Sequence, residues 1–215
     1  MNDVIYMFAM SLDGLIARTD GAIDWLDEFP ADADFDFPAF EDSVTGIVMG
    51  RASYDAARRH PEWHYARWPV VVATRKPLSD PPANVRAVEG SPADMLARLR
   101  EMGAAGRIWM FGGGVLARQF MDAGLLDTVE VGIIPVVLGH GIPAFGGAQP
   151  DRWLELDFAR PLRHGAIHAR YRVRKVERKD NAEGHGERIR HDAGVSWFLA
   201  GPAPESPNGV AAEPQ

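Results

Sequence analysis

The sequence contains no cysteine among its 215 residues. This absence excludes disulfides, thiolate nucleophiles and zinc-thiolate sites together. No apolar run approaches the roughly 18 residues that a membrane-spanning helix needs. The first residues alternate like a strand and lack the basic start of a signal peptide. We therefore expect a cytoplasmic protein that stays off membranes and is held together by packing alone.

Acidic residues outnumber basic residues in this chain. It has 23 lysines and arginines against 30 aspartates and glutamates, which gives a formal net charge of -7 at pH 7. Because such a chain has no field that would attract a polyanion, we do not expect nucleic acid as a partner. We also expect no metal, and assign no role to five histidines that show neither metal-ligand spacing nor a paired carboxylate: His60, His64, His140, His164 and His168.

Apolar residues, by contrast, make up 46% of the chain, which is enough for one continuous core. We predict a single domain over residues 1–176. From 177 to 215 the composition becomes charged and rich in glycine and proline, so we predict a disordered tail there. Within that tail the apolar segment 195–200 either docks on the body or on a partner, or stays mobile as termini usually do.

Short β-branched runs alternate with amphipathic segments, which is the pattern of an α/β protein with a largely parallel sheet. The predicted strands are apolar and closed by turns: 3–10, 46–49, 70–74, 85–88, 107–111 and 128–138. The predicted helices are 51–59, 92–102 and 115–123. The second of these has a clear start, because Ser91 can cap it and Pro92 suits its first turn.

The end of the domain breaks this alternation. Two extended segments, 153–160 and 166–176, follow one another around residues 161–165 with no helix between them. They predict a terminal antiparallel hairpin. The second segment alternates apolar and basic residues, which indicates a half-exposed strand at or near a sheet edge or a dimer surface.

Three consecutive glycines, 112–114, stand between a predicted strand and a predicted helix. Glycines let the backbone approach a ligand and leave amide donors free, and the start of the following helix favours an anion. A pyrophosphate suits this environment. The spacing is not the GxGxxG of a Rossmann fold, and the alternative is a tight strand-to-helix turn.

Two further strand ends carry cations and hydroxyls. After one strand come Gly50, Arg51 and Ser53, and at the end of the next come Thr74 and Arg75. Ligands of open parallel sheets bind outside the carboxyl ends of the strands, so three strand ends converge on one anionic ligand. Arginines there suit a 2′-phosphate, which favours NADPH over NADH. For Arg51 the alternative is an ordinary arginine on a surface helix.

Six blocks of this sequence resemble the reductases related to dihydrofolate reductase and to the reductase domain of the bifunctional riboflavin-biosynthesis deaminase/reductase. In order they are AMSLDGLIA (9–17), DGAIDWL (20–26), MGRASY (49–54), VATR (72–75), GGGVL (112–116) and IPVVLGHGIP (134–143). The resemblance implies a single-domain dihydrofolate-reductase-like α/β fold. It would have a mostly parallel sheet of about eight strands, flanking helices and a C-terminal antiparallel hairpin. It further implies NADPH as cofactor, a small-molecule substrate and a homodimer.

By this resemblance the cofactor-binding residues fall into three groups. Around the nicotinamide half, under a loop of residues 11–25, are Ala9, Ile16, Gly21 and Trp25. At the adenosine phosphate end are Gly50, Arg51, Ser53, Thr74 and Arg75. At the pyrophosphate are Gly113, Gly114, Val115 and Leu116.

The catalytic acid is harder to predict. Dihydrofolate reductases carry a substrate-binding carboxylate shortly after a Pro-Ala pair, where this chain offers Asp32, Asp34 and Asp36. We choose Asp34, because Phe35 and Phe37 beside it would line an apolar pocket. The alternative is that these aspartates are helix-start residues favoured by the helix dipole.

Two other residues near the expected nicotinamide have competing interpretations. Asp13, in the Ser-Leu-Asp-Gly segment beside the expected ring, is a second candidate for the acid, and the favoured alternative is that it fixes a turn by accepting hydrogen bonds from backbone amides. Trp25 either stacks on a substrate ring or belongs to the core.

One position departs from the riboflavin pattern. Those reductases carry a glutamate directly before the glycine run, where it contacts the ribosylaminouracil substrate, and this chain has Phe111 there. The substrate is therefore expected to differ. Without cysteine the chain also lacks the C-x-x-C zinc signature of the fused deaminase.

Three functional hypotheses follow. The first is an NADPH-dependent reductase of a small heterocyclic, carbonyl or imine substrate, similar to 5-amino-6-(5-phosphoribosylamino)uracil reductase. The second is a non-catalytic NADP(H)-binding sensor or interaction module, which would bind NADPH without oxidising it. The third is a dimerisation scaffold whose tail residues Trp197 and Phe198 recruit a partner.

Overall fold

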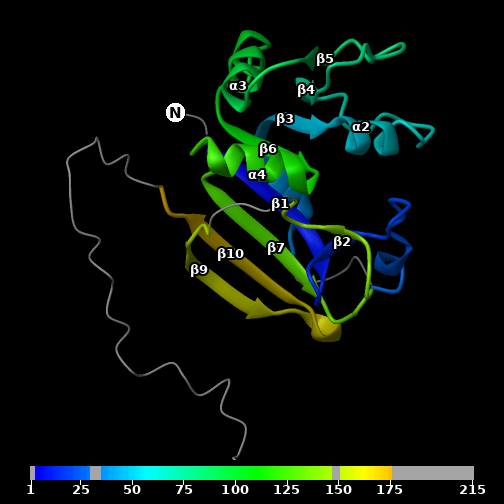
Figure 1. Ribbon diagram of the computed structural model, residues 1–215, viewed down its shortest axis with the longest axis vertical. Helices are drawn as coiled ribbons and strands as arrows, with labels where there is room; N and C mark the ends of the chain where they lie inside the picture. Colours follow the sequence, from blue (N-terminus) through cyan, green and yellow to red (C-terminus); the bar gives the residue numbers. More distant parts are fainter. Residues whose placement is uncertain (1–2, 30–34, 147–150, 176–215) are drawn as a thin grey trace, which may run out of the picture. The chain divides into compact units, whose positions relative to one another are not determined.

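The computed structural model describes residues 3–29, 35–146 and 151–175. Its main element is an eight-stranded sheet in the order β5-β4-β3-β6-β1-β7-β10-β9 (Figure 1). The strands are β1 (Val4–Ser11), β3 (Val44–Gly50), β4 (Val70–Ala73), β5 (Val85–Val88), β6 (Arg107–Gly112), β7 (Thr128–Ile134), β9 (Leu154–Pro161) and β10 (Ile167–Val173). A small second sheet pairs β2 (Leu15–Ala17) with β8 (Ile142–Pro143).

The strands from β5 to β7 pair in parallel, whereas β10 pairs antiparallel with both β7 and β9. The predicted fold class is confirmed: a mostly parallel sheet that ends in an antiparallel hairpin. The strand predicted to be basic and half exposed is β10. It lies next to the edge strand β9, where the sequence places it.

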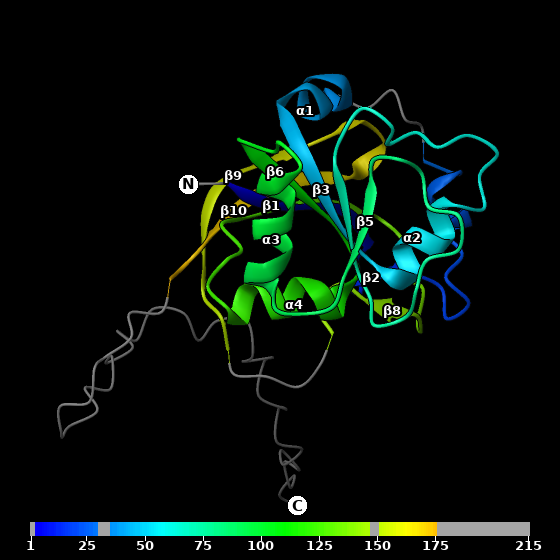
Figure 2. The ribbon, with the colours of Figure 1, turned by 90° about the horizontal axis from the view of Figure 1, so that it is seen from above.

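Four α-helices flank the sheet in the described residues: α1 (Phe37–Ser43), α2 (Arg51–Ala57), α3 (Pro92–Glu101) and α4 (Gly114–Asp122). Figure 2 shows α3 and α4 on one side of the sheet and α1 on the other. Leu99 of α3 and Phe120 of α4 are fully buried in one core cluster, while Phe40 of α1 and Tyr54 of α2 lie in the other. The sheet therefore separates two apolar layers, and each layer buries one helix pair.

Local chemistry explains where several elements begin and end. Ser91 caps α3, because its hydroxyl accepts a hydrogen bond from the Asp94 amide at 3.3 Å, and the Asp94 carboxylate accepts one from the Ser91 amide at 2.7 Å. The strand predicted over 128–138 stops at Ile134, because Pro135 has no amide hydrogen for the ladder.

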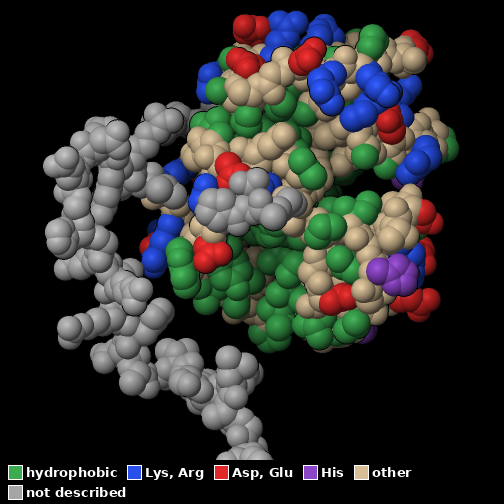
Figure 3. Space-filling view, in the orientation of Figure 1, with side chains coloured by type: hydrophobic (Ala, Val, Ile, Leu, Met, Phe, Trp, Pro, Cys, Tyr) green, Lys and Arg blue, Asp and Glu red, His purple; other side chains and the backbone are tan. Residues whose placement is uncertain are grey.

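An apolar patch faces solvent over β9 and β10, where Figure 3 shows hydrophobic side chains in the lower part of the view. Trp153, Leu156 and Ile167 are exposed to 66%, 57% and 44%. No helix of the described residues is long and apolar enough to cross a membrane. The predicted tail, 177–215, and its segment 195–200 lie outside the described residues.

Candidate active site

The glycine junctions of β3 and β6 lie side by side. β3 ends at Gly50 and its neighbour β6 ends at Gly112. A Cβ atom on Gly50 would lie 3.3 Å from the carbonyl oxygen of Gly112 and 3.5 Å from the amide nitrogen of Gly113. The peptide bond between Gly112 and Gly113 is cis. Two of the strand ends predicted to hold one ligand are thus in direct contact.

The second and third glycines of the run face different surroundings. A Cβ on Gly114 would overlap the carbonyl oxygens of Pro143 and Ala144, so this glycine is needed for close packing. A Cβ on Gly113 would meet no atom within 4 Å. Gly113 is also the N-cap residue of α4 and has no side chain to cap the helix, so the amides of the first turn receive no hydrogen bond from an N-cap side chain. Gly113 therefore faces open space beside uncapped donors.

The two other residues predicted to contact the pyrophosphate also differ in how exposed their side chains are. Val115 is 64% exposed, whereas the Leu116 side chain is buried in the core, so only its backbone can face a ligand. Ser53, on the first turn of α2, lies against the glycine run, because a Cβ on Gly112 would be 3.3 Å from its hydroxyl.

Arg51 is engaged within the protein. Its Nε donates to both carboxylate oxygens of Asp55 at 2.9 Å, and its Nη1 donates to the carbonyl oxygen of Pro77 at 3.2 Å. Arg51 thus fastens α2 to the loop that follows β4. The spacing of Arg51 and Asp55, four residues apart on a helix, is the sequence signal that could have predicted this pair.

Arg75 differs from Arg51. Its side chain is exposed and makes no hydrogen bond or ion pair with any residue that the structure describes. Thr74 before it shapes the turn, since its hydroxyl accepts a hydrogen bond from the Lys76 amide at 3.1 Å. Of the two predicted phosphate-binding arginines, Arg75 is the one whose guanidinium has no partner among the described residues.

Two of the four predicted nicotinamide residues pack together near the end of β1. Ala9 and Ile134 pack in one apolar cluster with Trp25, which is 5% exposed. The Trp25 indole Nε1 is buried and has no hydrogen-bond partner among the described residues. Ile16 is half-buried in β2, and Gly21 has φ +86° in the turn that follows. A buried donor without a partner is costly, so Nε1 marks a place where a ligand or water can bind.

The Asp13 carboxylate accepts hydrogen bonds from backbone amides, as the sequence predicts. The amides belong to the loop after β7, however, and not to the turn that contains Asp13. Its carboxylate accepts hydrogen bonds from the amides of Leu138 at 3.1 Å and Gly139 at 2.8 Å. A side-chain hydrogen bond from Ser11 and these amides lower the pKa of Asp13 to about 2. The ionised carboxylate therefore ties the turn after β1 to the loop after β7.

A buried charged network on β7 and β10 was missed from the sequence. His168 Nε2 lies 2.7 Å from Glu130 Oε1, and Arg170 Nε donates to Glu130 Oε2 at 2.8 Å. The Glu130 and His168 side chains are only 3% and 5% exposed. The prediction that His168 has no paired carboxylate is therefore wrong. The reason is that the pair forms between strands, 38 residues apart, where sequence spacing gives no signal.

The hydrogen bonds define the state of this network. Arg160 Nε donates to His168 Nδ1 at 3.3 Å, and the other ring nitrogen of His168, Nε2, faces Glu130 Oε1 at 2.7 Å. Burial acts to raise the pKa of Glu130. The hydrogen bonds from His168 and Arg170 and the charge of Arg170 outweigh it, so the pKa is lowered. Glu130 is thus a buried carboxylate that is kept ionised.

Strand register places this network beside the predicted nicotinamide residues. Ala9 of β1 pairs with Gly132 of β7, which pairs with His168 of β10 and, beyond it, Arg160 of β9. A Cβ on Gly132 would meet no atom within 4 Å. Open space therefore lies above the sheet between Ala9 and His168.

A pocket of about 490 Å³ lies over this part of the sheet. Its lining joins α1 and the two residues before it to β6, β7, β9 and β10, and consists of Phe35, Asp36, Ala39, Phe40, Ser43, Arg107, Glu130, Phe158, Arg160, His168 and Arg170. No group of three or more histidines, aspartates and glutamates in the described part of the chain could hold a metal ion.

The predicted acidic segment is only partly described. Asp32 and our choice, Asp34, lie outside the described residues. Asp36 caps α1, since its carboxylate accepts a hydrogen bond from the Ala39 amide at 3.0 Å, which is the alternative that the sequence offered. Phe35 lines the pocket and packs edge-on against His168, with ring centroids 4.9 Å apart.

Phe111, at the position where the resemblance implies a glutamate, belongs to a cluster of aromatic rings. Its ring lies 4.9 Å from Trp109 and 5.2 Å from Tyr65, centroid to centroid. Burial raises the pKa of Tyr65 to about 12, so its hydroxyl stays protonated. The surface before the glycine run is therefore apolar and holds no carboxylate at this position.

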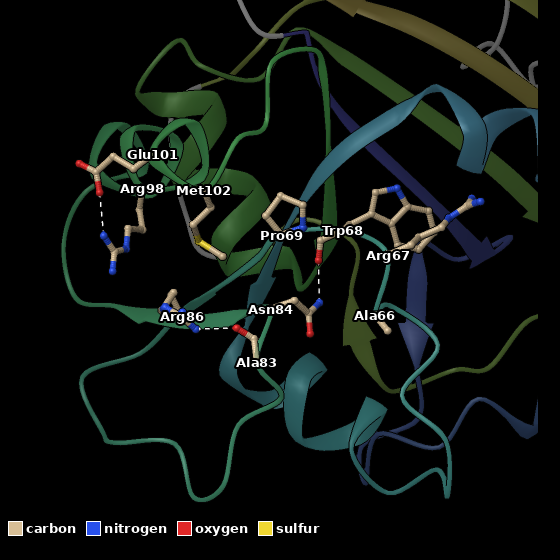
Figure 4. Close-up of a pocket in the computed structure, with 10 residues that line it drawn as sticks. All are labelled: Ala66, Arg67, Trp68, Pro69, Ala83, Asn84, Arg86, Arg98, Glu101 and Met102. Atoms are coloured by element: carbon tan, nitrogen blue, oxygen red, sulfur yellow. Dashed lines mark hydrogen bonds and ion pairs between the residues drawn. The ribbon is translucent and has the colours of Figure 1, made fainter.

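A second pocket, of about 480 Å³, lies at the amino ends of β4 and β5 (Figure 4). Its arginines are already bonded, because Arg98 pairs with Glu101 at 2.7 Å and Arg86 donates to the carbonyl oxygen of Ala83 at 2.8 Å. It opens at the end of the sheet opposite to the glycine junctions, so it does not contribute to the predicted cofactor site.

Comparison with known proteins agrees with this architecture. Residues 2–166 match the model of the RibD C-terminal domain family. The uncharacterized protein YwjB of Bacillus subtilis (strain 168) is 36% identical over 143 residues, which cover 66% of this chain and 81% of YwjB.

Two solved structures have the same fold. A putative riboflavin biosynthesis protein from Shewanella sp. PV-4 superimposes with a TM-score of 0.69 at 28% identity, covering 81% of this chain and 99% of that one. Dihydrofolate reductase from Enterococcus faecalis, complexed with NADP(H) and RAB-propyl, gives a TM-score of 0.56 at 16% identity over 80% of this chain and 96% of its own.

Proposed function

The chain belongs to the RibD C-terminal domain family, and from this premise we propose that it is an NADPH-dependent reductase of a small heterocyclic, carbonyl or imine substrate. The observation that carries the proposal is the contact between the β3 and β6 strand ends. There Gly50 meets the Gly112–Gly113 peptide and open space lies over Gly113. Such a junction of glycine backbone and uncapped amides fits a pyrophosphate.

The residues present fit the rest of a nicotinamide dinucleotide. Arg75, exposed and uncommitted at the neighbouring strand end, suits a 2′-phosphate. Ala9 and Trp25 form an apolar seat for a ring, with the unpaired Trp25 Nε1 as a donor. Bound NADPH would supply the hydride, so the protein has to orient an acceptor on the ring and exclude water from it.

The kind of substrate that we propose follows from the residues beside the glycine run. Phe111, Tyr65 and Trp109 give an apolar wall before the glycine run, which favours a substrate without the ribosyl group that a glutamate would bind. Asp34 stays our candidate for the carboxylate that contacts substrate. If it does, Asp34→Asn lowers kcat while the affinity for NADPH is unchanged, as measured by steady-state kinetics and calorimetry.

The test is a thermal shift assay with NADPH and with NADH. We expect NADPH to raise the melting temperature more than NADH, because only NADPH carries the 2′-phosphate. Arg75→Gln should remove most of that difference, while Arg58→Gln, another exposed arginine beyond the end of α2, should keep it. Equal shifts by the two cofactors would contradict the proposal. Binding without NADPH oxidation on a panel of ketones, imines and pterins would favour a non-catalytic sensor instead.

We also propose a homodimer. The exposed apolar side chains of Trp153, Leu156 and Ile167, on and beside β9 and β10, support it, because large apolar side chains are costly to leave in water. Light scattering coupled to gel filtration should give twice the mass of the 23.6 kDa chain. A monomer at micromolar concentration would overturn this.

A further inference from the structure

The Tyr65 hydroxyl is a hydrogen-bond donor for which the described part of the chain offers no acceptor. The side chain is half-buried, and its ring lies 5.2 Å from that of Phe111 and 5.1 Å from that of Trp63, centroid to centroid. The hydroxyl oxygen is not fully enclosed, and no described residue hydrogen-bonds to it. Burial, and after it the charge of Glu41, raises the pKa of Tyr65 to about 12. The phenol therefore keeps its proton at neutral pH and can donate a hydrogen bond to a ligand.

Strand pairing places Tyr65 within reach of the proposed nicotinamide seat. Continuing the parallel register of β1 and β6 by one residue puts Met7 next to Phe111. Both side chains pack with Tyr65 against the same core cluster. Ala9 lies on the same face of β1 as Met7 and about 7 Å further along the strand. A ring held at Ala9 can therefore extend toward Phe111 and Tyr65.

The apolar wall before the glycine run offers a donor where the resemblance implies an acceptor. The Trp109 indole in this wall already donates to the carbonyl oxygen of Met7 at 3.2 Å, which leaves the Tyr65 hydroxyl to bind a ligand. At the position of Phe111 a glutamate would only accept hydrogen bonds. A phenol donates more readily than it accepts, because its lone pairs are delocalised into the ring. The hydrogen-bonding sense is therefore reversed, from an acceptor for ribosyl hydroxyls to a donor.

We propose that Tyr65 donates a hydrogen bond to the substrate, and that the substrate is a flat, uncharged ring with a carbonyl oxygen or ring nitrogen on the edge away from its reacting carbon. A flat ring suits the aromatic wall, against which it can pack edge-on or offset. A charge buried against this wall would lose its hydration without gaining a partner, so the ring is uncharged. Naming the ligand as the substrate rests on the proposed reductase function, whereas its binding at Tyr65 does not.

Binding is tested by NMR titration of the full chain without NADPH, with quinoline and indole as probes. Both are flat, bicyclic and uncharged at neutral pH, but the ring nitrogen of quinoline only accepts a hydrogen bond and that of indole only donates one. We expect quinoline to bind about fivefold more tightly, which is the worth of one hydrogen bond, and to shift the amides of Tyr65 and Phe111. Equal or tighter binding of indole, or no shift of these amides at any soluble concentration of quinoline, would overturn the proposal.

A variant without the hydroxyl locates the donor. Tyr65→Phe breaks no hydrogen bond of the described chain, so it should fold. It should weaken quinoline binding about fivefold and leave indole binding unchanged. The matched control is Tyr171→Phe, on β10 and packed against the other core cluster, which should leave both affinities unchanged. Unchanged quinoline affinity in Tyr65→Phe would contradict the assignment.

A second variant, Phe111→Glu, tests the reversed hydrogen-bonding sense. With a carboxylate in the wall, indole should bind more tightly than quinoline, because the carboxylate accepts from the indole N–H and offers quinoline nothing. A preference for quinoline that persists in a folded Phe111→Glu would overturn the role of this position. If Phe111→Glu does not fold, Tyr65→Phe decides the proposal.

The link to the reaction is tested with NADPH and two aldehydes, quinoline-6-carbaldehyde and 2-naphthaldehyde, which differ only in that a ring nitrogen replaces a CH group. Each is reduced to the alcohol by hydride from NADPH to the carbonyl carbon and a proton from solvent to the oxygen. The KM of the quinoline aldehyde should be about fivefold lower, and Tyr65→Phe should remove this difference with little change in kcat. A KM difference that persists in Tyr65→Phe would contradict substrate binding by Tyr65. If neither aldehyde oxidises NADPH while quinoline binds as expected, the proposed function fails and the donor site stands.

Discussion

The glycine junctions of β3 and β6 and the charged network of β7 and β10 lie on one sheet but are built in opposite ways. At the junctions, backbone faces open space, since a Cβ on Gly113 would meet no atom within 4 Å. In the network, charged side chains are bonded to one another and buried, and Glu130 and His168 are 3% and 5% exposed. The comparison suggests that changes at the junctions affect binding, whereas changes in the network affect folding.

The largest effect is expected from Glu130→Ala. It leaves His168 and Arg170 without their shared acceptor in a buried place, so the free energy of unfolding should fall by about 3–5 kcal/mol. The measurement is urea denaturation followed by tryptophan fluorescence.

The matched control for that change is Glu155→Ala. Glu155 lies on β9 and pairs with Arg174 at 3.0 Å, but it is 47% exposed, so its loss should cost at most about 1 kcal/mol. If Glu130→Ala lowers the free energy of unfolding by as little as Glu155→Ala does, the network does not stabilise the fold in the way that distinguishes it from the glycine junctions.

The next effect in size is expected from Gly113→Ala. The added methyl group meets no atom within 4 Å and the backbone φ is negative, so the melting temperature without ligand should stay the same. The methyl group projects into the space proposed for a phosphate, so the affinity for NADPH should fall about tenfold, which is roughly 1.4 kcal/mol. Calorimetric titration measures this. If NADPH affinity is unaffected while stability falls, the glycine is there for the fold and not for a ligand.

The smallest of these effects is expected from Asp13→Asn and depends on pH. The folded pKa of Asp13, about 2, lies below that of an unfolded aspartate. Its ionised form therefore stabilises the fold above the unfolded pKa, and that contribution is lost as the pH falls toward 2. The melting temperature of Asp13→Asn should be lower than that of the native protein at pH 6, and the gap should close on acidification. A gap that is constant from pH 6 to pH 2.5 would contradict the carboxylate tie between the loops.

The sequence predicts the junctions well because their chemistry is local. A strand, a glycine run and a helix follow one another at residues 107–122, and each has its own signal in composition and periodicity. The same holds for α3, whose cap at Ser91 was predicted and forms. Short elements without such signals were missed, including β2 and β8, which exist only because their two segments pair with each other.

The network could not be predicted because it depends on register. Alternation assigns His168 to one face of its strand, but the partner of that face follows from the pairing of β10 with β7. A shift by one residue would turn His168 to the other face, away from Glu130. Arg51 lies between these two cases. Its bond to Asp55 can be predicted from helical spacing, whereas its contact with Pro77 depends on the tertiary fold.

We propose that NADPH binds at the glycine junctions and not in the pocket lined by Glu130, His168 and Arg170. The most direct test is an NMR titration of the full chain with NADPH, followed through the backbone amides. We expect the largest shifts at residues 50–53, 74–75 and 112–116, with much smaller ones at Glu130 and Arg170. Largest shifts at Glu130 and Arg170, with residues 112–116 unchanged, would contradict it.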